Sequence, residues 1–279
     1  MKKLGRMIMA TLFFAGSVST ATAGADVSKM KDALNKKAAV FSALHKRASR
    51  NLQTAAQDKT FSEYFETTDK SEKKRLKAEI ENLSLAVQKK FEVDEMCLID
   101  LSGQEITRIV FDKIAPDADL SSEEASAPFF NPSVAKEARQ VYISAPYLSA
   151  DSKRWVIAYT TPIMTKDGKK AAILHYEIPL SVYQEKLVKE FKGKDEYILA
   201  VGKDGLLWAD SRRTYNLKGN PEKEVNPSDY FPPLDKDIRS SIKNGKSGEG
   251  SFEKGGKSYS IVYKPLGYQD WSLAVVSPE

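Results

Sequence analysis

The chain has 279 residues, of which 41% are hydrophobic and 29% charged, so it has enough apolar side chains for a substantial core. Three basic residues lie in the first 23 positions, and the remaining 256 residues carry a net charge near +2. This balance gives no support for the clustered basic surface that nucleic-acid binding needs. One cysteine, Cys97, excludes an intramolecular disulfide framework, and two histidines argue against histidine-based metal ligation and most Ser-His or Cys-His catalysis.

The first 23 residues have the order of a secretory signal peptide. Residues 1–6 are basic, residues 7–18 are apolar, and residues 21–23 form an A-x-A cleavage site. The apolar run is too short to span a bilayer comfortably, so an uncleaved membrane anchor is the less favoured alternative. We therefore expect residues 1–23 to be removed and the mature protein to be periplasmic or secreted.

Residues 24–91 are predicted to be helical. From residue 27 to 55, apolar side chains recur at spacings of three and four, as on one face of an amphipathic helix. Lys37 and Asn51 interrupt a strict heptad, so this stripe suits docking on a neighbouring element or a loose coiled-coil dimer. His45 lies on this helix beside basic residues and is interpreted as exposed to solvent.

The rest of the helical region is predicted as a turn followed by a second helix. Residues 61–65 indicate a short aromatic turn, and Asp69 with Glu72 forms a capping box that opens a helix over 71–91. After residue 91 the pattern changes to that of strands and turns. The predicted strands cover residues 92–101, 104–111, 141–144, 154–161, 170–178, 196–201, 206–210, 250–254, 257–265 and 271–277, with helices over 181–191 and 235–243.

The two strand-rich stretches share one design. Two turn glycines, Gly103 and Gly205, lie 102 residues apart, and two prolines near strand ends, Pro162 and Pro265, lie 103 apart. A hairpin, a helical excursion and a three-strand meander at a constant offset predict two α+β modules of similar topology, over residues 92–190 and 191–279. Two unrelated meanders are the alternative.

Motifs for catalysis and cofactor binding are missing. The sequence has no G-x-S-x-G, no H-E-x-x-H and no G-x-G-x-x-G after a strand, and position 240 is serine where a P-loop would have glycine. Asp94, Asp100 and Asp112 could meet around a cation, but we favour turn and strand-end roles for them. The sequence therefore predicts no enzyme activity, no cofactor and no metal.

The aromatic side chains concentrate in the first module, around two predicted strands. On strand 154–161, alternation places Trp155 and Tyr159 on one face. On the next strand it places His175 and Glu177 together on one face. Buried polar groups need a partner, and a ligand can be that partner; a solvated sheet face is the alternative.

At these segments the chain resembles the double Cache family of tandem PAS-like extracytoplasmic sensor modules of bacterial receptors. The resembling segments are residues 98–108, 141–147, 155–162 and 172–178. The resemblance implies an α+β fold with a long N-terminal helix followed by two PAS-like antiparallel-sheet modules, membrane-distal then membrane-proximal. It also implies a small-molecule pocket in the distal module, between the sheet and a covering segment over 127–138.

The aromatic concentration, the strand alternation and the resemblance together give a set of candidate ligand-binding residues. Glu177 matches the family's acidic residue on the last distal strand, and an aromatic pair stands where many relatives have Trp-Tyr. The set is Phe129, Phe130, Tyr142, Tyr147, Trp155, Tyr159, His175 and Glu177. Relatives that sense amino acids have an arginine just before the pair, whereas residues 126–128 here are Ser-Ala-Pro. A cationic or amine ligand held by Glu177 and aromatic rings is therefore expected. Arg154 could contact a ligand carboxylate, but a surface arginine is the favoured interpretation.

These features predict a periplasmic, non-enzymatic sensor protein. The chain ends at Glu279 with no signalling domain, so the signal is expected to pass to a separate partner such as a membrane receptor. A homodimer through the N-terminal helix is a further expectation. The alternative is a structural or interaction module that binds no small ligand and docks a receptor through its long helix or surface, and an exported enzyme is the least favoured reading.

Overall fold

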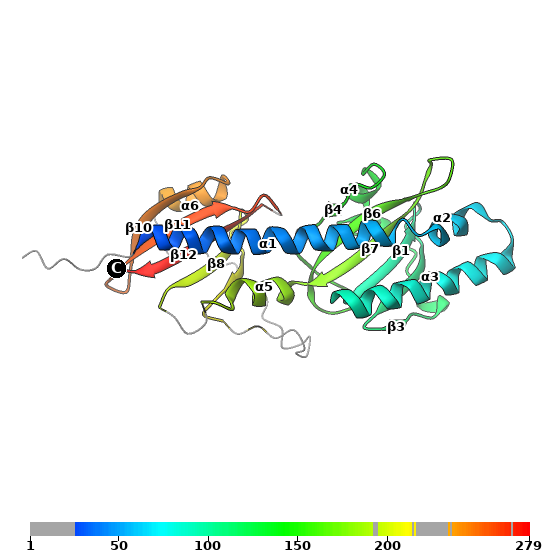
Figure 1. The fold of residues 1–279 in the computed structure, drawn as a ribbon, viewed down its shortest axis with the longest axis horizontal. Helices are drawn as coiled ribbons and strands as arrows, with labels where there is room; N and C mark the ends of the chain where they lie inside the picture. The colour runs from blue at the N-terminus through cyan, green and yellow to red at the C-terminus, as the bar shows by residue number, and fades with distance from the viewer. Residues whose placement is uncertain (1–25, 192–194, 214, 216–233, 235, 269) are drawn as a thin grey trace, which may run out of the picture.

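The computed structural model describes residues 26–279 except 192–194, 214, 216–233, 235 and 269. Two antiparallel sheets lie along one long N-terminal helix (Figure 1). The expected leader over 1–23 lies outside the described residues. Among the helices that are described, none is long and apolar enough to cross a membrane.

Helix α1, Val27–Ala55, runs past both sheets (Figure 1). It begins at Asp26, whose carboxylate accepts a hydrogen bond from the Lys29 backbone N–H at 3.1 Å. Its buried stripe repeats every three or four residues, as predicted, and docks on the two sheets. The stripe consists of Met30, Leu34, Lys37, Phe41, His45, Ala48 and Leu52.

Two polar side chains lie inside this stripe, and the prediction for His45 was wrong. His45 is fully buried, because its spacing of four from Phe41 and three from Ala48 places it on the apolar face. Lys37 is also buried, and its Nζ donates to the Lys186 carbonyl oxygen at 3.1 Å. Position on the helix, rather than polarity, decides which residues face the sheets.

Two further helices follow α1. Residues 61–65 belong to α2, Lys59–Glu66, rather than to the predicted turn. Asp58 explains the difference, because its carboxylate caps this helix by accepting from the Thr60 backbone N–H at 2.9 Å. Helix α3, Lys70–Phe91, has the predicted Asp69 cap, which accepts from two backbone N–H groups of the first turn.

The distal module is built on the first sheet, whose strand order is β3-β2-β1-β7-β6-β4, with β5 also paired to β6. One face of this sheet packs against α1 and α3, and the other is covered by helix α4, Phe130–Val134, with the short 3₁₀ turn η2, Glu124–Ser126, beside it. A second 3₁₀ turn, η1 at Asp117–Asp119, follows β3, and its Asp117 pairs with Lys77 of α3. The strands are β1 Glu95–Asp100, β2 Glu105–Val110, β3 Lys113–Ile114, β4 Tyr142–Ile143, β5 Tyr147–Leu148, β6 Trp155–Met164 and β7 Lys170–Pro179.

Helix α5, Leu180–Val188, leads into the proximal module, whose strand order is β10-β11-β12-β8-β9. The same order occurs in the distal sheet as β4-β6-β7-β1-β2, so the predicted repeat is confirmed. The two turn glycines match closely, with φ of 90° at Gly103 and 91° at Gly205. Pro162, however, lies within β6 rather than at its end. The proximal elements are β8 Tyr197–Gly202, β9 Leu207–Asp210, α6 Lys236–Lys243, β10 Gly248–Lys254, β11 Lys257–Pro265 and β12 Trp271–Pro278.

One hydrophobic core is shared by α1 and both modules. At the junction, the rings of Trp208 and Trp271 stack with centroids 5.6 Å apart, and Trp155 contacts Trp208 edge-on at 5.7 Å. Phe41 of α1 packs on Trp271 at 5.4 Å. The predicted fold class, a long helix followed by two antiparallel-sheet modules, is confirmed.

Candidate functional site

Strands β1 and β7 bring four polar side chains together on one face of the distal sheet. In their antiparallel pairing Glu95 lies opposite Glu177, and Cys97 lies opposite His175. Residues two apart on a strand, and residues directly opposed across strands, point to the same face. All four are buried, with exposed fractions of 1–4%. We refer to Glu95, Cys97, His175 and Glu177 as the polar cluster.

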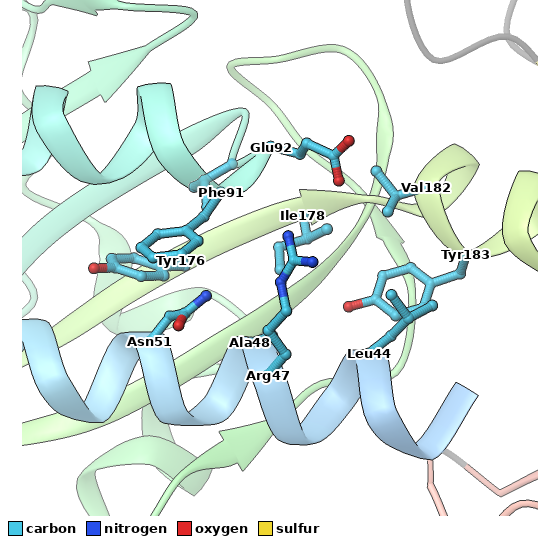
Figure 2. Close-up of a pocket in the computed structure, with 11 residues that line it drawn as sticks. Leu44, Arg47, Ala48, Asn51, Phe91, Glu92, Tyr176, Ile178, Val182 and Tyr183 are labelled. Atoms are coloured by element: carbon cyan, nitrogen blue, oxygen red, sulfur yellow. The ribbon is translucent and has the colours of Figure 1, made fainter. Parts of the chain in front are cut away.

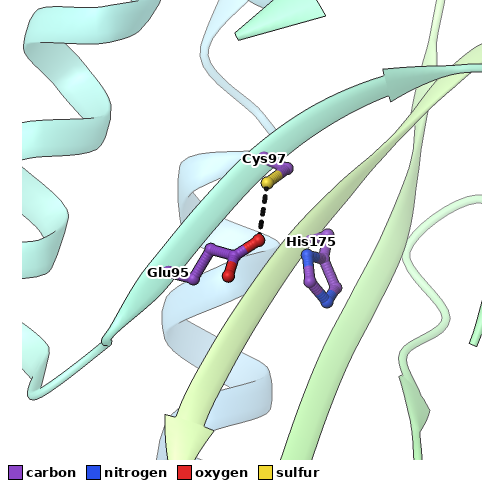
Figure 3. Close-up of side chains that lie close together, drawn as sticks. All are labelled: Glu95, Cys97 and His175. Atoms are coloured by element: carbon purple, nitrogen blue, oxygen red, sulfur yellow. Dashed lines mark hydrogen bonds between the residues drawn. The ribbon is translucent and has the colours of Figure 1, made fainter. Parts of the chain in front are cut away.

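The β1 half of the polar cluster is held by short contacts among carboxyl, thiol and hydroxyl groups. The Cys97 thiol lies 3.2 Å from Glu95 Oε1 (Figure 3) and 3.4 Å from Glu105 Oε1. The Ser149 hydroxyl donates to Glu95 Oε2 at 3.3 Å. Arg108 pairs with Glu105 at 3.0 Å, which places a positive charge at the edge of the cluster.

The β7 half is organised around the imidazole of His175. Its Nε2 lies 3.3 Å from the Tyr147 hydroxyl and 3.7 Å from Glu177 Oε1, and the Tyr147 hydroxyl donates to the same carboxylate oxygen. His175 Nδ1 and Glu177 Oε2 are buried with no hydrogen-bond partner. Two polar atoms of the cluster are therefore left with unused bonding capacity.

The predicted aromatic pair covers the polar cluster. The ring of Phe129 stacks on His175 with centroids 4.1 Å apart and planes 13° from parallel. Phe130 is buried beside it in the same apolar group. The Ser133 hydroxyl bonds the Phe129 carbonyl oxygen at 2.5 Å and the Thr160 hydroxyl, which fixes α4 on β6. Half-buried Tyr142 packs against the same apolar group.

Two of the eight predicted residues lie on the opposite face of the sheet. Tyr159 opposes Tyr176 across β6 and β7, and both side chains belong to the core on the α1 side. Its hydroxyl lies 2.5 Å from His45 Nδ1 and 2.5 Å from the Tyr183 hydroxyl. Trp155 is at the junction with the proximal module. The structure therefore brings six of the predicted residues together and separates these two from them.

Arg154 is neither a surface side chain nor free to bind a ligand carboxylate. Its Nη1 is 3.1 Å from Asp94 Oδ2, and the arginine side chain is only 13% exposed. Asp100 accepts from the Ser102 backbone N–H at 2.8 Å, which is the predicted turn role. Asp94 and Asp100 thus have structural partners.

Burial sets the protonation states of the polar cluster. Desolvation raises the pKa values of both Glu95 and Glu177, the latter to about 7, and raises the pKa of the Cys97 thiol. Burial lowers the pKa of His175 to about 3, so this imidazole is neutral at physiological pH. Within the described part of the chain, no lysine or arginine forms an ion pair with Glu95 or Glu177. The cluster therefore offers donor atoms suited to a cation.

Four cavities of the molecule lie away from the polar cluster, and none of its four residues lines them. A crevice of about 30 Å³ between α1, the end of α3, β7 and α5 is lined by Tyr176 and Tyr183 (Figure 2). It has room for one or two water molecules, not for an organic ligand. Larger surface grooves of 270–370 Å³ lie beside α1 and on the proximal module, away from the cluster.

A model of the Cache domain, in its double form, matches residues 22–279. The chain belongs to the Cache domain family. No curated protein sequence gave a significant match.

Solved structures share the Cache fold over nearly the whole chain. The sensory domain of the Campylobacter jejuni chemoreceptor Tlp3, with isoleucine bound, superposes with a TM-score of 0.69 at 10% identity, covering 90% of this chain and 92% of that one. An extracellular domain assigned to a histidine kinase, mmHK1S-Z2, gives 0.64 at 16% identity, with 90% and 96% covered. A Vibrio parahaemolyticus domain assigned to the sensory box/GGDEF family gives 0.62 at 13% identity, with 90% and 96% covered.

Sequence reasoning missed the β1 half of the polar cluster in this Cache module. The signal is a pair of alternating polar residues, Glu95-x-Cys97, inside an otherwise apolar strand. It mirrors His175-x-Glu177 on β7. Only the pairing of β1 with β7, which are about 80 residues apart in the chain, brings the two signals together.

Proposed function

We propose that this Cache protein is an extracytoplasmic, non-enzymatic sensor that binds a small positively charged ligand in its distal module and signals through a separate protein. Support comes from the family and from its structural neighbours, which include the Tlp3 sensory domain solved with isoleucine, norvaline and valine. The sensory domains of chemoreceptors and histidine kinases share this architecture.

The observation that carries the proposal is the buried acidic pair Glu95 and Glu177. A buried carboxylate without a cation is costly, so these groups are either protonated or paired with a positive ligand. The aromatic rings of Phe129 and Tyr147 lie beside the pair and could add cation–π attraction for an amine. A cationic ligand would thus relieve the electrostatic cost of the cluster.

The same geometry argues against an α-amino acid as the ligand. An α-carboxylate needs a cationic or N–H-rich partner. The arginines nearest the cluster are already engaged, Arg108 with Glu105 and Asp151, and Arg154 with Asp94. The segment before Phe129 supplies no arginine.

The location and partners of the protein follow from the same proposal. A leader over residues 1–23 would be cleaved, leaving a periplasmic or secreted protein that docks a membrane receptor. The apolar stripe of α1 is used inside the molecule, so a homodimer through α1 would use its polar outer face. Ligand binding would shift packing between the distal module and α1 or the partner surface.

The test is to purify residues 24–279, denature the protein and search for a co-released small molecule by mass spectrometry. A thermal-shift panel of amines, amino acids, carboxylates and purines runs beside it. A ligand at about 100 times its Kd adds about 2.7 kcal/mol of stability. We expect Glu177→Gln to weaken binding about 10-fold or more. Glu137→Gln, which changes an exposed carboxylate near the cover, is the matched control. Equal affinity in Glu177→Gln and the wild type would refute the site.

A second function, an interaction module without a small ligand, is favoured by one observation. Phe129 already stacks on His175, so side chains fill the space where a ligand would lie. An organic ligand would have to displace this ring. If no compound is released and none stabilises the protein, the interaction module is the better reading, and a search for a protein partner follows.

A further inference from the structure

We propose that Glu95, Cys97 and His175 bind a divalent transition-metal ion, for which zinc is the best fit. This inference deepens the proposed function, because it names a chemical class for the cation in the distal module. It can also fail alone, since an organic cation could bind where a metal does not.

The first argument is the donor set. One ligand atom each from Glu95, Cys97 and His175 lies within 4.8 Å of the others, and all three residues are buried. Thiolate sulfur, imidazole nitrogen and carboxylate oxygen are the usual zinc ligands, and the donors of a tetrahedral site lie about 3.3–3.8 Å apart. The Cys97 sulfur and Glu95 oxygen are already 3.2 Å apart, so side-chain shifts of about 1 Å would complete the geometry. Hard cations such as Mg²⁺ prefer all-oxygen sites.

The second argument is the orientation of His175. Its Nε2 faces the Glu177 carboxylate and the Tyr147 hydroxyl, whereas its Nδ1 is buried with no partner. Figure 3 shows a ring nitrogen turned toward Glu95 and Cys97. Histidines that ligate metals direct the second ring N–H to a carboxylate, which fixes the ring. Glu177 has the place of that carboxylate.

The third argument is charge balance. A divalent ion bound by one thiolate, one carboxylate and one neutral imidazole makes a group of zero net charge. Such a group is far cheaper to bury than an isolated carboxylate. With three protein ligands the fourth position stays open to water or to an atom of a second ligand.

The fourth argument is size. Phe129 is in van der Waals contact with His175, and the cluster residues already touch one another. A single ion fits among these donors without displacing the ring from the site. The Phe129 ring then shields the donors from bulk solvent, which strengthens the electrostatic interactions around the ion while one coordination position stays open to a single water molecule.

Cobalt is a decisive probe of the site, because a thiolate-to-cobalt absorption band can arise only from Cys97, the single cysteine of the sequence. Residues 24–279 are stripped with a chelator and then equilibrated with Co²⁺ alone or Zn²⁺ alone at neutral pH. We expect one ion per chain, intense visible bands of tetrahedral cobalt and a near-ultraviolet thiolate-to-cobalt charge-transfer band. Zinc should displace cobalt and remove these bands.

Variants assign the ligands. Cys97→Ser should abolish the charge-transfer band, His175→Gln should abolish tight binding, and Glu177→Gln should weaken zinc binding about 10- to 100-fold through loss of the orienting carboxylate. Glu137→Gln, checked like the others for native circular dichroism, should bind as the wild type does. Weak octahedral cobalt bands without charge transfer in the wild type, or zinc affinity unchanged in Cys97→Ser, would overturn the inference. The wild-type spectrum decides even if a variant fails to fold.

The outcomes separate the two proposals. An amine or other organic ligand that binds in the absence of metal would leave the sensor proposal standing and overturn the metal site. Metal binding with the expected spectrum and no organic ligand would support a metal-responsive sensor. Failure of both would overturn both and favour the interaction module.

Discussion

His45 allows a sharp test of how α1 is held against the distal module. The imidazole is fully buried, and burial lowers its pKa from 6.5 to about 3. Its Nδ1 bonds the Tyr159 hydroxyl at 2.5 Å. We expect His45→Phe, which keeps an aromatic ring in the stripe, to lower the free energy of unfolding at about pH 7.5 by 1–2 kcal/mol through the lost hydrogen bond.

The pH dependence of the free energy of unfolding provides a second check on the role of His45. Between about pH 3 and 6.5 the unfolded chain binds more protons at His45 than the folded chain does, so this residue's contribution to stability falls as the pH falls. From these pKa values, the wild type should lose about 2 kcal/mol at this site between about pH 7.5 and pH 5. The variant lacks this loss, so its stability deficit should shrink by about 2 kcal/mol and be abolished or slightly reversed near pH 5.

The assay is urea unfolding followed by tryptophan fluorescence at both pH values. Tyr159→Phe is the matched control, because it removes the same hydrogen bond and leaves the titrating imidazole in place. It should be destabilised but keep the wild-type pH dependence. Lys46→Ala, on the exposed face of α1, should change stability by less than about 0.5 kcal/mol. A deficit in His45→Phe that is the same at both pH values would refute the reasoning.

Three further changes test other parts of the fold, each measured by the urea-unfolding midpoint. Phe129→Ala should lower the free energy of unfolding by about 3–5 kcal/mol, because it leaves a cavity over the polar cluster. Phe129→Leu should lower it by about 1.5 kcal/mol or less, and equal losses in the two variants would contradict close packing of Phe129. Asp69→Ala should cost about 1 kcal/mol by uncapping α3, with Asp69→Ser restoring most of it. Gly168→Ala should cost roughly 1 kcal/mol, because the glycine has a positive φ but the new Cβ would meet no other atom. Gly103→Ala should cost well over that amount, because Gly103 also has a positive φ and its new Cβ would lie 2.5 Å from a backbone nitrogen of η2.

The helical periodicity of α1 could be predicted from sequence, but the environment of individual positions could not. The spacing of apolar residues gave the bounds of the helix correctly. His45 was misjudged because residue type was weighed above position, although it sits at the correct three- and four-residue spacing; Lys37, placed in the stripe by its spacing, is buried as well. A hydrogen bond from another element makes each polar group tolerable in the core, and that partner lies more than 100 residues away.

Alternation predicted which residues of one strand share a face, and the structure bears this out for His175 and Glu177. Alternation could not predict which residues of β6 point to the same side of the sheet as His175 and Glu177 of β7. That depends on register, and Ala158, not Tyr159, opposes Glu177. Glu95 and Cys97 were missed for a related reason, since strand order is set by non-local pairing that the local sequence does not encode.

The path of α1 has a consequence for how the chain acquires its fold. The helix spans about 43 Å, and its first half packs on β11 and β12, the last strands to be synthesised. Near its start, Lys31 pairs with Glu249, and Asn35 accepts a hydrogen bond from Lys264 at 3.0 Å, a contact between residues 229 positions apart. Contacts of such long range form slowly because they close large loops. The beginning of α1 can therefore pack on its sheet only after the C-terminal residues have been synthesised. The core of the proximal module in turn includes side chains of α1, which lies at the other end of the chain.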